Sequence, residues 1–268
     1  MLNSYGEFDL NTEFVYDKEW ADELYQTLLT NQEIIKTYVK EHNLVKEYRN
    51  SMNLFRERAK RYNPYLNQED DEVKTDRYFY VYTSMYEYKP KTNLWGQAKP
   101  FSFYEEVERV SKTFGLNRSL AGKEVRTPYF NPIASDKING ALGILGANVE
   151  FVWNNDNPLV LISKIVPTLT AIQPLVDGNH RTSHAMIQYY LGKAGLPAIA
   201  RNKHLKEHYK AYTIFEREAI VNDDINDLIA YYFYNIAERQ EQICKELGIS
   251  PNMIFNGRKF CVEDELIL

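Results

Sequence analysis

Hydrophobic positions at helical spacing define the centre of the chain. Residues 158–172 are apolar at Leu159, Ile162, Ile165, Leu169 and Ile172 among others, and residues 182–191 repeat the pattern after a short polar interruption. The first segment lacks the alternation of a half-buried strand, and glycine follows the second one. The pattern therefore predicts a helix–loop–helix from residue 158 to residue 194.

Other segments predict a mainly helical chain around this centre. Asp17 is expected to cap a first helix, and a second helix over about residues 31–49 would complete a helical hairpin. Further helices are expected at three places, residues 103–114, 205–218 and 224–247.

Two segments are less regular. Residues 77–88 are rich in β-forming side chains but also tolerate a helix. Residues 122–157 contain many glycines and prolines and a β-like run at 149–153, which favours strands and loops there.

Composition narrows the class of protein. The 268 residues carry a net charge of −5 with a pI near 5.7, so no basic field would attract a nucleic acid. The start of the chain resembles no signal peptide. The most apolar run, residues 159–176, contains Lys164, Pro167 and Pro174, so it fits a buried helix better than a membrane span. The only two cysteines, Cys244 and Cys261, predict no disulfide framework. We expect a cytoplasmic protein, with export as an effector left open.

The loop inside the helix–loop–helix carries unusual chemistry. Asp177-Gly178-Asn179 is a turn composition, and the first N–H groups of the following helix have no partner within it. Arg181 adds a guanidinium for a phosphate, and Asp177 a carboxylate for a divalent cation. The alternative is an ordinary helix–loop–helix capped by Asp or Asn.

Histidine spacing gives a second hypothesis. His180 and His184 lie four residues apart, as do His204 and His208. Such pairs share one helix face and can chelate a transition metal. With Asp177, a site for Fe²⁺ or Zn²⁺ with two histidines and one carboxylate is chemically possible, although the second pair also fits a solvated helix face.

The loop sequence resembles the signature of the Fic (Fido-domain) family, His-Pro-Phe-x-Asp/Glu-Gly-Asn-Gly-Arg-x-x-Arg. Five positions keep the pattern: Pro174, Asp177, Gly178, Asn179 and Arg181. Gln173, His180 and His184 stand in place of the usual His, Gly and final Arg, and Leu175 stands where the pattern has Phe. Residues 121–127 resemble the entry to the family's flap hairpin, and residues 191–197 resemble its continuation after the motif. The resemblance covers about residues 103–233.

The resemblance implies a mainly α, Fido-like helical bundle with a small β-hairpin flap that includes Arg126 and Thr127. It also implies three regions along the chain. Residues 1–100 would be an N-terminal helical appendage, residues 101–248 the Fic-like core, and residues 249–268 a C-terminal tail.

The resemblance also implies an activity and the residues that carry it. Asp177 would hold Mg²⁺, while Gly178, Asn179, Arg181 and His184 would bind phosphates. Gln173 occupies the position of the family's histidine but cannot accept a proton near neutral pH. Loss of a general base commonly lowers the rate about 10²–10⁴-fold.

We therefore expect a divergent Fic-type transferase with Gln173, Asp177 and His180 as catalytic candidates. It would move a nucleotidyl or related phosphate-containing group, as in AMPylation, from a nucleotide-type donor to a hydroxyl on a protein or small molecule. The alternatives are a catalytically dead binding module and a metalloenzyme that uses the histidine pairs with Asp177.

Overall fold

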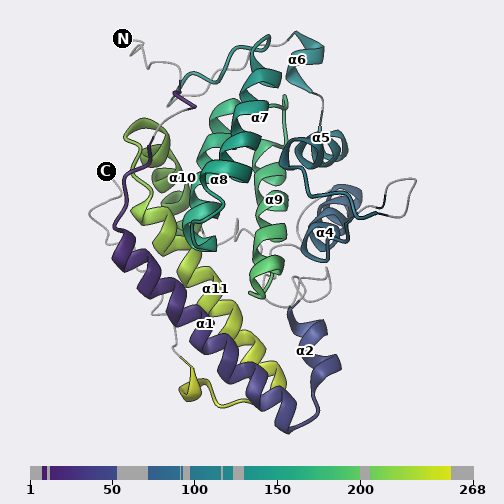
Figure 1. Ribbon diagram of the computed structural model, residues 1–268, viewed down its shortest axis with the longest axis vertical. Coiled ribbons are helices and arrows are strands. Elements are labelled where there is room, and N and C mark those ends of the chain that lie inside the picture. Colours follow the sequence, from purple (N-terminus) through teal and green to yellow (C-terminus); the bar gives the residue numbers. More distant parts are fainter. Residues whose placement is uncertain are drawn as a thin grey trace.

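Helices α8 (Pro158–Ile172) and α9 (Asn179–Ala194) lie at the centre of the computed structural model (Figure 1). The structure describes residues 8–10, 13–52, 72–90, 92, 97–115, 117–122, 130–199 and 206–254. Every side chain of α8 from Leu159 to Ile172 is buried, because other helices cover α8 on all sides. The predicted central helix–loop–helix is confirmed.

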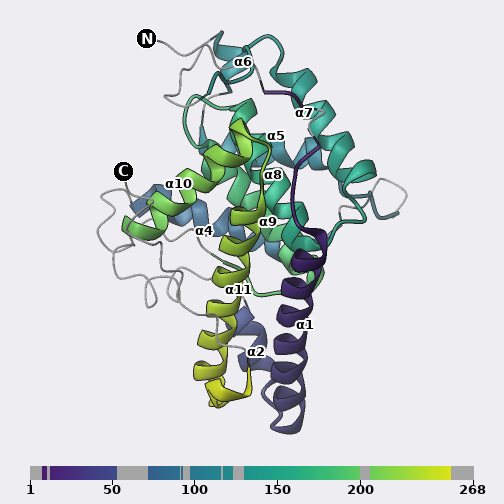
Figure 2. The same ribbon diagram turned by 90° about the vertical axis from the view of Figure 1, so that its left-hand side faces the viewer.

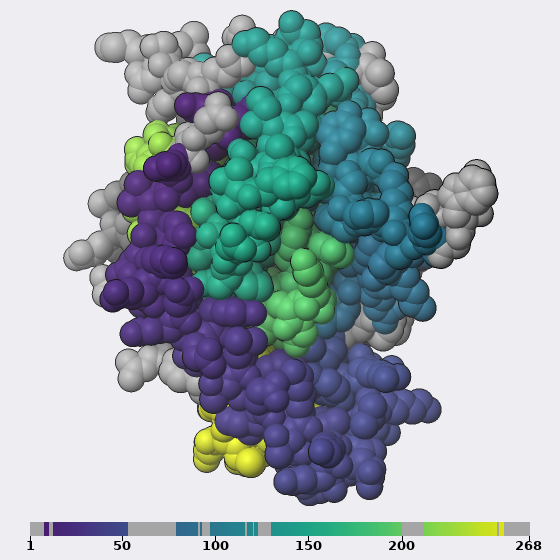
Figure 3. Space-filling model, in the orientation of Figure 1, coloured from purple at the N-terminus to yellow at the C-terminus, as the bar shows by residue number. Residues whose placement is uncertain are grey.

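The neighbours of α8 and α9 come from both halves of the chain. Helices α4 (Glu72–Tyr86) and α5 (Phe103–Phe114) pack on α9, whereas α7 (Ile138–Ala147), α10 (Lys206–Val221) and α11 (Asn226–Leu247) pack on α8. In the space-filling view, a strip of α9 reaches the surface between the segments coloured teal and blue (Figure 3).

The secondary structure of residues 77–88, which the sequence left open, is helical as far as Tyr86, the last residue of α4. It approaches α9 closely at Gly192, where an added Cβ would lie 2.3 Å from the carbonyl oxygen of Tyr86. One hydrophobic cluster also includes Leu28 and Met85 together with Ile165. Side chains before and after residue 100 thus share this cluster, while the division into an appendage, a core and a tail stays a prediction.

Helices α1 (Lys18–Glu41) and α11 run side by side in the same direction (Figures 1 and 2). Hydrogen bonds join Asp17 to Asn226 and Asn31 to Gln240, pairs that are both 209 residues apart. The side chain of Asp17 accepts from the N–H of Trp20, so the predicted cap is confirmed.

The predicted break near residue 30 is wrong. Helix α1 continues to Glu41, because Asn31 and Gln32 are buried against Gln240 instead of lying in a turn. The chain turns instead at Asn43, whose φ is 56°, and α2 (Val45–Met52) follows.

The expected strand at residues 149–153 is also wrong. These residues lie largely in the π-helix η2 (Asn148–Val152), which continues α7, and the N–H of Trp153 donates to the carbonyl of Asn148 over 2.7 Å. Val149 and Trp153 are buried, so a helical spacing of four overrides the β-forming composition. The flap residues Arg126 and Thr127 lie outside the described residues.

The remaining helices agree with the predicted helical pattern. Gly195 and Gly248, both left-handed, end α9 and α11, while α6 (Arg118–Ala121) and the 3₁₀-helix η3 (Pro251–Met253) are short.

Burial raises the pKa of the Cys244 thiol to about 11. None of the helices in the described ranges is both long and apolar enough to cross a bilayer.

Candidate functional site

Residues 173–178, which connect α8 to α9, form a loop held by backbone hydrogen bonds. Gln173 ends α8 in the left-handed conformation, with φ 47° and ψ 64°, and its N–H donates to the carbonyl of Leu169. The carbonyl of Pro174 accepts from the N–H of Arg118 over 2.9 Å. These contacts fix the loop at its start.

Asn179 fixes the loop at its other end. Its Oδ1 accepts from the N–H of Leu175 over 2.8 Å, and its Nδ2 donates to the carbonyl of Leu175 over 2.9 Å. The carboxamide of Asn179 therefore shapes the loop, and its backbone N–H is one of the first N–H groups of α9. A direct contact between its side chain and phosphate stays a prediction.

Two glycines let the loop lie against the end of α5. Gly178 has a φ of 97°, and an added Cβ would lie 3.1 Å from the Cβ of Phe114. At Gly115, an added Cβ would lie 2.3 Å from the carbonyl oxygen of Asp177. Any larger residue at position 115 would push the loop away from α5, so Gly115 belongs to the site although the sequence did not mark it.

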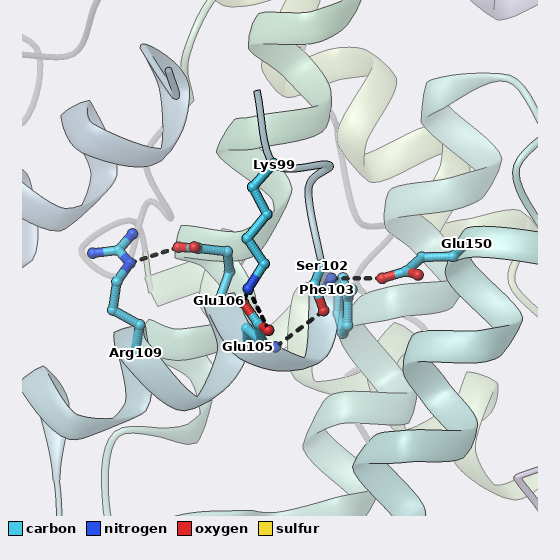
Figure 4. Close-up of polar contacts among 7 residues, drawn as sticks. All are labelled: Lys99, Ser102, Phe103, Glu105, Glu106, Arg109 and Glu150. Atoms are coloured by element: carbon cyan, nitrogen blue, oxygen red, sulfur yellow. Dashed lines mark hydrogen bonds and ion pairs between the residues drawn. The ribbon is translucent and has the colours of Figure 1, made fainter. Parts of the chain in front are cut away.

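Helix α5 is itself anchored at its first turn (Figure 4). Ser102 caps it by accepting from the N–H of Glu105, and Glu150 of η2 accepts from the N–H of Phe103 over 2.8 Å. Lys99 forms an ion pair with Glu105 near the same end. A carboxylate at the positive end of a helix is favourable. These contacts hold in place the helix whose last residues support the loop.

The first turn of α9 presents backbone N–H groups without a partner among the described residues, and an ion pair lies beside them. The first hydrogen bond within α9 runs from the N–H of Thr182 to the carbonyl of Gly178, so the N–H groups of residues 179–181 precede it. Arg181 donates from Nη2 to Oδ2 of Asp177 over 2.9 Å. The Asp177 side chain is 86% exposed and that of Arg181 is 25% exposed, which leaves both accessible from solvent.

His180, on the same turn, contacts a buried glutamate of α10. Its Nε2 lies 2.9 Å from Oε2 of Glu216, whose side chain is only 7% exposed. Oε1 of Glu216 accepts from the hydroxyls of Thr170 and Tyr212, each over 2.8 Å. The His180 side chain is 40% exposed. The carboxylate of Glu216 is thus buried and, among its partners in the described part of the chain, contacts a partly exposed imidazole.

His184 lies in different surroundings one turn further along α9. It is 2% exposed, with ring centroids 5.6 Å from Tyr212 and 6.4 Å from Tyr232. The structure places His184 among aromatic rings inside the protein, and its predicted contact with phosphate remains untested.

The described residues bring together no three His, Cys, Asp or Glu side chains in an arrangement that could hold a metal ion. Asp177, His180 and His184 do not form such a group, because His180 faces Glu216 and His184 is enclosed. His204 lies outside the described residues, so the second histidine pair is not tested.

Comparisons with known proteins identify the fold. No protein-family model matches the chain, and no curated protein matches it by sequence. The structure is similar to the crystal structure of a Fic domain-containing signaling protein from Bacteroides thetaiotaomicron VPI-5482, with a TM-score of 0.50 and 15% sequence identity. The match covers 86% of this chain and 98% of that chain.

At this identity the similarity establishes a shared fold. The protein has a mainly helical, Fic-like fold, as its loop sequence predicts. The retained motif positions Pro174, Asp177, Gly178, Asn179 and Arg181 all lie at the junction of α8 and α9.

Proposed function

We propose that this protein is a divergent Fic-type transferase. It moves a phosphate-containing group from a nucleotide-type donor to a hydroxyl on a protein or a small molecule. The observation that carries the proposal is the ordered loop before α9, in which Asn179 bonds both backbone groups of Leu175 next to the partly exposed Arg181. The Fic-like fold supports it.

The donor's phosphates would bind at the first turn of α9. The N–H groups of residues 179–181 and the positive end of the helix dipole favour an anion there. Arg181 supplies a guanidinium that can bond two phosphate oxygens, and its partner Asp177 is exposed enough to release it. Gly178 keeps the loop close to Phe114, so no side chain at that position stands between the phosphate and the backbone.

Asp177 fits a role in holding Mg²⁺. Mg²⁺ is commonly held by one or two carboxylates together with substrate phosphates and water, so a single exposed carboxylate next to the phosphate site suffices. When bound, the ion would neutralise charge on the donor's phosphates. The Asp177–Arg181 ion pair would then open, with the carboxylate turning to the metal and the guanidinium to phosphate.

Gln173 would position the acceptor. It stands where the family has its basic histidine, at the end of α8, and it is half-buried. A carboxamide can donate and accept hydrogen bonds but cannot take a proton near neutral pH. The acceptor's proton must therefore pass to another side chain.

A thermal-shift screen of the metal-free protein tests the proposal. ATP, ADP, nucleotide sugars and CDP-alcohols are added with and without Mg²⁺. A ligand at 100 times its Kd should stabilise the fold by about 2.7 kcal/mol, which is roughly 5–10 °C in Tm. We expect at least one diphosphate-containing compound to stabilise the protein, and Mg²⁺ to increase the effect.

The variant Arg181→Ala should weaken binding of that compound about 10- to 100-fold, the usual effect of losing a hydrogen bond to a charged group. Arg49→Ala is the matched control, because Arg49 is an exposed arginine on α2. Equal binding by both variants would show that the phosphate site lies elsewhere. Silence of the wild-type protein towards every compound would favour a binding module.

A further inference from the structure

We infer that Glu216 and His180 form the proton-accepting pair of this site, with Glu216 positioning His180 and His180 acting as the base. The inference rests on the proposed transferase function. It assigns a role to a buried glutamate of α10 that the loop motif does not contain, and it supplies the base that Gln173 cannot provide.

The hydrogen bonds around Glu216 determine which form of His180 is present. Both hydroxyl partners donate to Oε1, Thr170 from α8 and Tyr212 from α10. An ionised carboxylate only accepts hydrogen bonds, so Oε2 must receive a proton from Nε2 of His180. Neutral His180 then carries its hydrogen on Nε2 and its lone pair on Nδ1.

This arrangement is well suited to proton transfer. Nδ1 belongs to a side chain that is 40% exposed, on the same helical turn as the proposed phosphate site. If Nδ1 takes a proton, the resulting imidazolium is stabilised by the buried carboxylate at Nε2. A carboxylate that fixes the orientation and tautomer of a histidine is a common device in proton transfer.

The chemical step balances as follows. The acceptor oxygen forms a bond to phosphorus while its proton moves to Nδ1 of His180. The bond from phosphorus to the leaving phosphate oxygen breaks, and its electron pair stays with the leaving group. The imidazolium later returns the proton to solvent, so no oxidant, reductant or further reactant is needed.

The test uses the full chain and has a readout that does not depend on activity. Long-range ¹H–¹⁵N spectra of histidine-labelled protein report which ring nitrogen carries hydrogen, and His180→Asn assigns the His180 signals by their loss. In the wild-type protein at neutral to mildly alkaline pH we expect His180 with hydrogen on Nε2.

Glu216→Gln should reverse this tautomer. The carboxamide oxygen takes the Oε1 position and accepts from Thr170 and Tyr212, which places its NH₂ group against His180. Nε2 must then accept a hydrogen bond, so the ring hydrogen moves to Nδ1 and the base is lost. Glu218→Gln is the matched control, because Glu218 lies on the same helix and bonds Asn222 instead.

With a donor found by the binding screen, Glu216→Gln and His180→Asn should each slow transfer about 10²–10⁴-fold, with donor affinity changed less than threefold. Glu218→Gln should transfer at the wild-type rate. Circular dichroism checks that each variant folds, and Tyr212→Phe, which removes one donor to Glu216, provides a milder variant with an intermediate loss of rate.

The outcomes separate this inference from the proposed function. An Nδ1 hydrogen on wild-type His180, or a tautomer and transfer rate that Glu216→Gln leaves unchanged, would overturn the pair. The expected tautomers in a protein that transfers nothing from any donor would support the positioning of His180 by Glu216 and reject the transferase.

Discussion

Two buried polar networks stabilise contacts between helices, and they differ in charge and in access to solvent. Between α1 and α11, Gln240 donates to the carbonyl of Leu28 and to Oε1 of Gln32, and it accepts from Asn31. This amide network carries no charge, and all three amide residues are buried.

The second network, centred on Glu216, joins α8, α9 and α10. It contains a carboxylate, and it ends at an imidazole that solvent reaches. A network built on neutral amides fixes how two helices pair, whereas a carboxylate connected to an exposed titratable group can take part in chemistry. The α1–α11 network therefore contributes to stability, whereas the Glu216 network supports the proposed proton transfer at the first turn of α9.

Gln240→Leu should have the largest effect on stability. It leaves the buried amides of Asn31 and Gln32 short of a partner, and we expect a loss of roughly 3 kcal/mol in the free energy of unfolding. Urea denaturation measures the change. Gln26→Leu, at an exposed position of α1, should stay within about 0.5 kcal/mol. Comparable losses in the two variants would mean that the amide network contributes little.

Gly115→Ala should have the next largest effect, and it acts on the loop. The new Cβ cannot fit 2.3 Å from the carbonyl oxygen of Asp177, so the loop must shift, at a cost of about 2 kcal/mol. Gly143→Ala is the control, because it lies in α7 with open space around it and should gain about 0.5–1 kcal/mol. Thermal unfolding compares the two. A Gly115→Ala protein as stable as the wild type would show that the loop adapts freely.

Thr170→Val should have the smallest effect of the three. It removes a hydroxyl that donates to Oε1 of Glu216, with an expected loss of about 1 kcal/mol. Thr168→Val is the control, because that hydroxyl donates only to the carbonyl of Lys164 one turn earlier in the same helix, and its loss should be nearly neutral. If the two variants have the same stability, the Glu216 network is not held by Thr170.

The sequence predicted the centre of the fold because local signals agree there. Residues 158–172 have apolar positions at helical spacing, and the predicted glycine stop after the second segment is Gly195, which ends α9. The loop motif indicated the Fic-like fold. The strand predicted from composition at residues 149–153 was wrong, because burial of Val149 and Trp153 favoured a helical turn there.

Long-range contacts explain what the sequence could not predict. Helix α1 runs through Asn31 because its partner Gln240 lies 209 residues away. Glu216 lies 36 residues after His180 and belongs to an ordinary amphipathic helix, so no local pattern marks it. Gly115 belongs to the site because α5 ends against the carbonyl oxygen of Asp177, a contact that no local sequence pattern predicts.

The most direct test of the phosphate site is a titration of the ²H,¹⁵N-labelled protein with ADP and Mg²⁺, followed by backbone N–H resonances. We predict that the largest shifts fall on Asn179, His180 and Arg181, and that adenosine, which has no phosphate, causes none there. Shifts that cluster away from the start of α9, or equal shifts with adenosine, would contradict the assignment of this loop as the donor site.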